Sequence, residues 1–152
     1  MKTKHKIWEK AAIIVAVIVV AVIAAYMIIP SNSTGYSVDK AVIHLNEHAC
    51  KKSHNCCALY VAAAIHAGGL KPVLLRACDY SWYLPKIGFQ SVPTDNYKPR
   101  KGDIVVFPQV KNHIFGHIAM WNGNQWVSDF KQRGIIVSRE YQSAPYQIFR
   151  YN

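Results

Sequence analysis

The chain has 152 residues, in which 18 lysines and arginines outnumber 8 aspartates and glutamates, so its formal net charge is +10. This length leaves room for one domain and argues against an array of several. A basic domain suits anionic partners such as a cell wall or lipid headgroups, although its positive charges are scattered as on an ordinary solvated surface.

The first thirty residues differ in composition from the rest. Residues 1–10 carry four lysines, and residues 11–29 are nineteen apolar residues without a charge. A helix of that length is about 28 Å long, close to the thickness of the hydrocarbon core of a bilayer. Because the lysines come first, we expect a single-pass anchor in the bacterial inner membrane, with residues 1–10 in the cytoplasm. A cleaved signal peptide is the alternative.

Residues 30–38 follow as a short polar tether, and residues 39–152 form the predicted soluble domain. About 120 residues are enough for a hydrophobic core. From Ser31 onward, fourteen lysines and arginines stand against seven aspartates and glutamates. This domain is expected in the periplasm or outside the cell, where the cell wall is an available anionic partner and nucleic acid is not.

The first half of the domain predicts helices. Asp39 is placed to cap a helix that runs to about Cys50, and residues 56–69, CCALYVAAAIHAGG, predict a second helix that two glycines end. The second helix is apolar on nearly every side, so we expect it to be central and buried. A third helical stretch covers about residues 76–84, and a short strand follows near residues 89–92.

After residue 101 the hydrophobic period changes to two, which is typical of strands. The residues at 122–124, Asn-Gly-Asn, predict a hairpin turn between two of these strands. The predicted strands are GDIVVFP, HIAMW, QWVSDF, GIIVS and YQIFRY. N-terminal helices packed on a C-terminal antiparallel sheet give the fold class α+β, preceded by one transmembrane helix.

Residues 44–57, HLNEHACKKSHNCC, hold three histidines and three cysteines. His44 and His48 share a helix face, but the spacing of a zinc site is missing, which favours half-exposed helix positions over metal ligands. Outside the cytoplasm cysteines can pair. If one of the four cysteines is a nucleophile, at most one bridge remains, and pairing of Cys50 with either Cys56 or Cys78 stays open.

A cysteine nucleophile is the third interpretation of this segment. Cys56 and Cys57 lie at the start of the second predicted helix, where the helix dipole and free N–H groups stabilise a thiolate. An activated thiol there is expected to have a pKa below the usual value of about 8.5. It also needs a histidine from elsewhere, and His117 lies on a predicted strand. A three-residue loop at 122–124 puts Asp129 opposite His117 on the same face, whereas either two-residue turn puts it on the other face.

Three motifs then carry a resemblance. In order, CALYV at 57–61, GDIVVF at 102–107 and GHIAMW at 116–121 resemble the CHAP branch of the papain-like, NlpC-like cell-wall hydrolases, named for cysteine, histidine-dependent amidohydrolase/peptidase activity. The resemblance covers about residues 39–151. It extends to the small amidase effectors and phage lysins of that superfamily, in which the WxSDF pattern recurs.

The resemblance implies a catalytic triad. Cys57 matches the family nucleophile, because it stands three residues before the tyrosine of the CxxYV pattern, whereas Cys56 falls one residue too early. His117 matches the general base and Asp129 the residue that orients it. For the oxyanion, Asn55 is a guess as the second donor. Asp103 in GDIVVF matches a structural turn residue.

These observations predict a membrane-anchored cysteine hydrolase that cleaves amide bonds in peptidoglycan, as an amidase or a stem-peptide endopeptidase, through a thioester intermediate. We expect it to need no metal or cofactor, and an inhibitor or immunity protein is a candidate partner. Two alternatives remain. One is an anchored, non-enzymatic protein with a His/Cys metal site at residues 44–57, and the other is a papain-like hydrolase that acts on a protein or acyl substrate.

Overall fold

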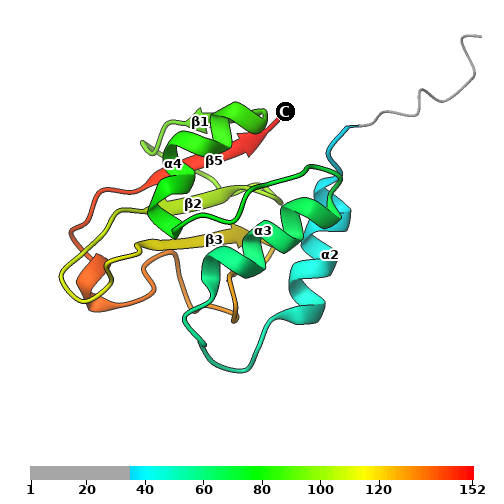
Figure 1. Ribbon diagram of the computed structural model, residues 1–152. Helices are drawn as coiled ribbons and strands as arrows, with labels where there is room; N and C mark the ends of the chain where they lie inside the picture. The colour runs from blue at the N-terminus through cyan, green and yellow to red at the C-terminus, as the bar shows by residue number, and fades with distance from the viewer. Residues whose placement is uncertain (1–34) are drawn as a thin grey trace, which may run out of the picture. The chain divides into compact units, whose positions relative to one another are not determined.

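The computed structural model describes residues 35–152 (Figure 1). The predicted cytoplasmic segment, the predicted anchor at residues 11–29 and the start of the tether lie outside the described residues. Within residues 35–152, no helix has the length and apolar character needed to cross a membrane.

The described residues form helices packed on a five-stranded antiparallel sheet, which confirms the α+β class. The strand order is β1-β5-β2-β3-β4. The strands are β1 Phe89–Val92, β2 Ile104–Phe107, β3 His117–Trp121, β4 Trp126–Val127 and β5 Gln147–Tyr151. The helices are α2 Val38–His48, α3 Cys57–Ala67 and α4 Tyr80–Tyr83, with short 3-10 turns η1 Ala77–Asp79, η2 Leu84–Ile87 and η3 Arg139–Tyr141.

The two main helices begin and end close to the predicted positions. The Ser37 hydroxyl accepts a hydrogen bond from the Lys40 N–H and caps α2, so Asp39 lies in the first turn rather than at the cap. Gly68 follows the last residue of α3. As expected from its composition, α3 is central, because four of its side chains are fully or almost fully buried: Val61, Ala62, Ala64 and Ile65.

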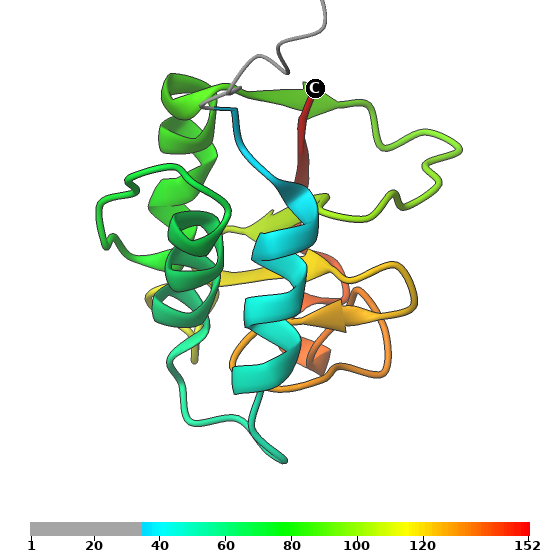
Figure 2. The same ribbon diagram turned by 90° about the vertical axis from the view of Figure 1, so that its right-hand side faces the viewer.

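Alternating side chains divide the core into two layers. Ile104, Val106, Ile118 and Met120 face the helices, whereas Val105, Phe107 and Ala119 face the long connection between β4 and β5. Figure 2 shows the helices and this orange connection on different sides of the strands. The connection contains the predicted strand at residues 134–138, which does not form: Ile135 and Val137 pack on the second layer instead of joining a ladder.

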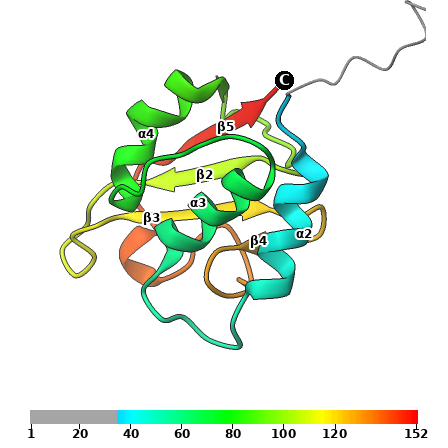
Figure 3. The same cartoon turned by 45° about the vertical axis from the view of Figure 1, so that its right-hand side comes forward.

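The hairpin between β3 and β4 does not have the expected three-residue loop. Met120 pairs with Val127, and the Asn122 N–H donates to the Gln125 oxygen at 3.0 Å, so the register is that of a two-residue turn at 123–124. The Asn122 side-chain oxygen accepts the N–H groups of Asn124 and Gln125 at 2.9 and 2.8 Å, which stabilises the tighter turn. Asp129 is therefore shifted from the position opposite His117. Figure 3 shows short β4 at the edge of the sheet beside β3.

Asp103 is the polar centre of the sheet's other end. Its carboxylate is fully buried and accepts two hydrogen bonds from Arg150, both at 2.7 Å. The Tyr97 hydroxyl and the Arg100 N–H donate to the same carboxylate at 2.7 and 2.8 Å. Asp103 thus joins the turn before β2 to β5, in agreement with a structural role.

We predict that Asp103→Asn lowers the free energy of unfolding by about 3–5 kcal/mol, because it leaves the Arg150 guanidinium without its counter-charge in a mostly buried position. Urea denaturation of the two proteins measures the difference. Asp39→Asn is the matched control: its ion pair with Lys101 is exposed, so we expect a loss of about 1 kcal/mol or less. Equal losses for both variants would contradict the role of Asp103.

Candidate active site

The N-terminus of α3 separates the two adjacent cysteines. Cys57 is the first residue of α3, and Cys56 is its N-cap. Cys57 is half-buried and lines a cleft of about 580 Å³ that is also lined by His117 and Asp129. The Cys56 sulfur instead approaches the backbone oxygen of His54 at 3.4 Å. The thiol that shares the cleft with the histidine is therefore that of Cys57.

The Cys57 thiol lies beside a gap in the sheet. Because β4 has only two residues in register with β3, no strand residue faces Ile118 on that side. The backbone N–H of Ile118, with the N–H groups of Cys57 and Ala58, acts to lower the pKa of the Cys57 thiol. The early end of β4 thus leaves a backbone donor free for the candidate nucleophile.

Burial nevertheless has the largest effect on the Cys57 thiol and raises its pKa, and the charge of Asp129 adds to this rise. The expectation of a depressed thiol pKa is therefore wrong for the free protein. Burial also lowers the pKa of His117 to about 4, against the opposing effects of the Asp129 charge and of the hydrogen bond between His117 and Gln132. Burial therefore disfavours both the thiolate of Cys57 and the imidazolium of His117 in the free protein.

Gln132 is the residue that contacts the imidazole. Its side-chain nitrogen lies 2.7 Å from His117 Nε2 and 3.1 Å from the Ser128 hydroxyl oxygen. The Ser128 hydroxyl in turn donates to Asp129 Oδ1 at 3.0 Å. All of these side chains are buried. Because Nε2 of His117 is engaged by Gln132, Nδ1 is the ring nitrogen left for the thiol.

Asp129 holds the segment before α3 rather than the imidazole. Its Oδ2 accepts hydrogen bonds from the His54 N–H at 2.6 Å, the Ser53 hydroxyl at 3.1 Å and the Cys56 N–H at 3.3 Å. Although burial acts to raise the pKa of Asp129, these donors hold it below its usual value. Among the described residues no hydrogen bond joins Asp129 to His117, so the expected direct contact is not formed.

The remaining walls of the cleft include one predicted residue and three that were not predicted. Asn55 lines the cleft with a left-handed backbone, φ 61°. Tyr141 contributes a buried wall, with its ring centroid 6.1 Å from that of His117. At the rim, the side chains of Ile114 and Phe115 are 63% and 60% exposed, which makes this edge of the cleft apolar and open to solvent.

Sequence reasoning missed Gln132 and Ser128. Gln132 lies in the run KQRG, which has the composition of an exposed turn. It is buried because the Gln132 N–H donates to the Trp126 oxygen at 2.9 Å, which folds the chain back after β4 and turns the amide toward His117. No local pattern in the sequence marks that reversal.

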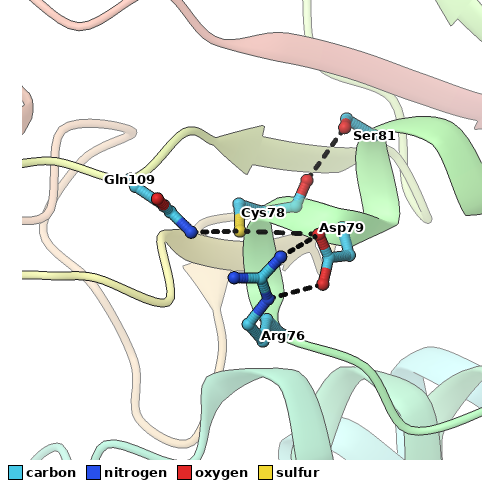
Figure 4. A network of polar contacts seen from close by, with 5 residues as sticks. All are labelled: Arg76, Cys78, Asp79, Ser81 and Gln109. Atoms are coloured by element: carbon cyan, nitrogen blue, oxygen red, sulfur yellow. Dashed lines mark hydrogen bonds and ion pairs between the residues drawn. The ribbon is translucent and has the colours of Figure 1, made fainter.

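A second cavity, of about 530 Å³, is lined by a polar network around η1 (Figure 4). Arg76 forms two hydrogen bonds to the carboxylate of Asp79, at 2.7 and 3.0 Å. The Cys78 sulfur lies 3.9 Å from Asp79 Oδ1 and 3.8 Å from the Gln109 amide nitrogen. The Cys78 N–H donates to the Phe115 oxygen at 2.9 Å. This network therefore supports the loop that carries the apolar rim.

The remaining cysteines and histidines of residues 44–57 make local contacts. All four cysteines are free thiols, and the Cys50 sulfur lies 3.3 Å from the Tyr60 hydroxyl. His44 and His48 stack with ring centroids 4.1 Å apart, and His48 Nδ1 is 2.7 Å from the His44 backbone oxygen. Within residues 35–152, no three histidine, cysteine, aspartate or glutamate side chains are grouped so that they could hold a metal ion.

No family model and no curated protein matches the chain. Solved structures do. The effector in the native type VI effector–immunity complex Tae3–Tai3 from Ralstonia pickettii is 32% identical, with a TM-score of 0.71, and the match covers 77% of this chain and 100% of that one. The selenomethionine form of the complex gives 32% identity, a TM-score of 0.67 and coverage of 72% and 98%.

A more distant likeness is to the effector Tae4 from Salmonella typhimurium, solved with the immunity protein Tai4 from Enterobacter cloacae. The identity is 14%, the TM-score is 0.51, and the match covers 77% of this chain and 98% of that one. At this identity the likeness extends to the fold alone. Both effectors thus resemble the domain of this chain in which helices pack on an antiparallel sheet.

We predict that at pH 7 iodoacetamide modifies Cys57 of the free protein more slowly than Cys56. Only the thiolate reacts, and burial raises the pKa of Cys57. The rate of Cys57 modification should therefore still increase with pH at values above about 8.5, where an ordinary thiol is already half ionised. Peptide mass spectrometry at a series of pH values measures each cysteine. In denatured protein the two rates should converge. A Cys57 rate that has already levelled off at neutral pH would show that the thiol is ionised at rest.

Proposed function

The chain belongs to the Tae3 family of type VI effectors, and we propose that it is a peptidoglycan amidase that uses Cys57 as its nucleophile. One observation carries the proposal: Cys57, at the N-terminus of a buried helix, and His117, on the adjacent strand, line the same cleft. The family membership supports an enzyme that acts on the cell wall. The exposed cleft rim leaves room for a polymeric substrate.

In the proposed reaction the Cys57 sulfur attacks the carbonyl carbon of an amide, and its proton passes to Nδ1 of His117. The C–N bond then breaks as the imidazolium gives that proton to the leaving amine, and a thioester remains. Water, deprotonated by His117, attacks the thioester carbonyl. The carbon–sulfur bond breaks, the proton returns to Cys57, and a carboxylate leaves.

Gln132 is proposed to orient His117 in place of the expected aspartate. To accept a proton at Nδ1, the neutral imidazole must carry its own proton on Nε2, and this N–H needs an acceptor. Within the described residues the buried Gln132 Oε1 has no hydrogen-bond partner. A half-turn of the amide exchanges its nitrogen and oxygen, which have nearly the same shape, and brings Oε1 to the 2.7 Å position. The Ser128 hydroxyl then lies between two acceptors, Gln132 Oε1 and Asp129 Oδ1, and donates to one of them at a time.

The first turn of α3 is proposed to bind the oxyanion. The first backbone hydrogen bond of the helix runs from the Tyr60 N–H to the Cys56 oxygen at 3.2 Å, so the N–H groups of Cys57 and Ala58 have no partner within the helix. In the proposed reaction the substrate oxygen lies against these N–H groups, which stabilise the negative charge of the tetrahedral intermediate. Asn55, which lines the same cleft, is retained as a further donor.

Asp129 is proposed to act as a positioning residue. It holds residues 53–56 in front of α3 through three hydrogen bonds, and it reaches His117 through Ser128 and Gln132. Its charge also favours the imidazolium. The triad inferred from the sequence is thereby replaced by a Cys57–His117 pair with an indirect carboxylate.

An immunity protein is proposed as a partner, because the solved relatives were crystallised as effector–immunity complexes. A bacterium that makes a cell-wall amidase needs to restrain it where its own wall is exposed. The apolar rim of Ile114 and Phe115, at the mouth of the cleft, offers a surface at which such a protein would block substrate entry.

We predict that Cys57→Ala lowers the rate of peptidoglycan cleavage by about 10⁴-fold or more, because no other group supplies the covalent step. Mass spectrometry of soluble muropeptides before and after incubation measures the rate and identifies the bond. Cys56→Ala, one residue away and outside the cleft, is the matched control and should keep most activity. Loss of activity in Cys56→Ala alone would show that Cys56 is the nucleophile. Full activity in both variants would refute the cysteine mechanism.

Residues 11–29 are proposed to anchor the domain in the inner membrane with residues 35–152 in the periplasm, on the basis of the uncharged span and the lysines before it. Protease added to spheroplasts should remove the domain and leave a protected N-terminal stub. A periplasmic marker and a cytoplasmic marker serve as controls for access. A mature N-terminus near Ala25, or a fully protected chain, is the result that refutes the anchor.

A further inference from the structure

A groove of about 460 Å³ beside the catalytic cleft is lined by four cationic side chains. We call it the basic groove. Lys51 and Lys52 come from the loop after α2, and Lys131 and Arg133 come from the segment after β4. All four are exposed. Among residues 35–152 none of the four forms an ion pair, and no aspartate or glutamate lines the groove.

The fold holds these charges together through its backbone. The Cys50 N–H donates to the Asp129 oxygen at 2.7 Å, and Cys50 forms a parallel bridge with Phe130. Lys131 forms a further bridge with Val127. The two segments that carry the cations are thus joined just before the charges begin. Like charges repel, so their convergence without a counter-charge indicates an anionic ligand.

The basic groove is continuous with the catalytic cleft. Ser53, Phe130 and Val137 line both. Gln132, which contacts His117, forms part of the groove wall. A chain whose amide lies at Cys57 therefore has a direct path into the basic groove, and a ligand there lies one side chain away from the imidazole.

We propose that the basic groove is a binding subsite for the carboxylate groups of an anionic peptide, the same chain whose amide is cut at Cys57. This deepens the proposed function and rests on it. The Arg133 guanidinium matches a carboxylate with two parallel hydrogen bonds, and the lysines add point charges. The apolar side chains of Phe130 and Ile136 in the same groove suit a peptide rather than a bare phosphate polymer.

The test measures equilibrium binding by calorimetry, with the full chain in detergent and Cys57→Ala present to prevent turnover. The ligands are a soluble muropeptide with free carboxylates and the same muropeptide with those carboxylates converted to carboxamides. The variant that also carries Lys131→Gln and Arg133→Gln should bind the free-acid muropeptide at least about tenfold more weakly. Its affinity for the carboxamide muropeptide should not change. Lys71→Gln with Lys98→Gln removes the same charge outside both the groove and the cleft and should change either affinity less than about twofold.

Turnover of the same muropeptides by chains that keep Cys57 separates the two proposals. The groove variant should raise KM more than it lowers kcat. Groove-dependent binding without any cleavage would support the subsite and refute the amidase. Cleavage with equal losses in both double variants, or with no effect of amidation, would refute the subsite and leave the amidase standing. Tighter binding of polyphosphate than of the free-acid muropeptide, lost in the groove variant, would also overturn the peptide assignment.

Discussion

The buried carboxylate of Asp129 connects both halves of the candidate site. One of its oxygens accepts three hydrogen bonds from residues 53–56, the segment that leads into α3. The other accepts the Ser128 hydroxyl, from which the contacts continue through Gln132 to His117. Hydrogen bonds to a charged group contribute about 1.5–3 kcal/mol each, and a buried carboxylate without them is strongly unfavourable. The thiol and the imidazole are therefore positioned by one constraint rather than by two independent ones.

The backbone around the same residue accounts for the short β4. After Val127 the chain leaves the ladder, because the Ser128 N–H donates to the Phe130 backbone oxygen and the Asp129 backbone oxygen accepts from the Cys50 N–H. A longer β4 would pair with the Ile118 N–H. Ending the strand early leaves this donor free, at the cost of one pair of ladder hydrogen bonds. At the site, backbone pairing between β3 and β4 thus stops, and side-chain contacts replace it.

Much of this fold follows from short-range patterns in the sequence, and the failures have a common physical origin. The buried helix α3 and the strands β2, β3 and β5 depend on periodicity and on helix ends, which neighbouring residues determine, whereas the choice of Cys57 and His117 rests on the family resemblance. The hairpin register depends on a single side chain, that of Asn122, which accepts two backbone N–H groups. Gln132 was missed because its burial depends on a chain reversal whose partners are distant in sequence. The segment at 134–138 has the composition of a strand, but its apolar side chains are used to cover the second face of the sheet.

Electrostatics then determine when the proposed nucleophile becomes reactive. A His117 pKa of about 4, instead of about 6.5, means that protonating the imidazole in the free protein at neutral pH is about 3 kcal/mol less favourable than in water. Burial disfavours the Cys57 thiolate as well, so the ion pair is not the resting state. In the proposed attack the sulfur loses its proton to His117 as negative charge develops on the substrate oxygen near the first turn of α3. The imidazolium formed in that step is favoured by the Asp129 charge. In the proposed mechanism the fixed charges and N–H groups of the cleft thus stabilise the transition state more than the free enzyme, which is the condition for catalysis rather than for tight binding alone.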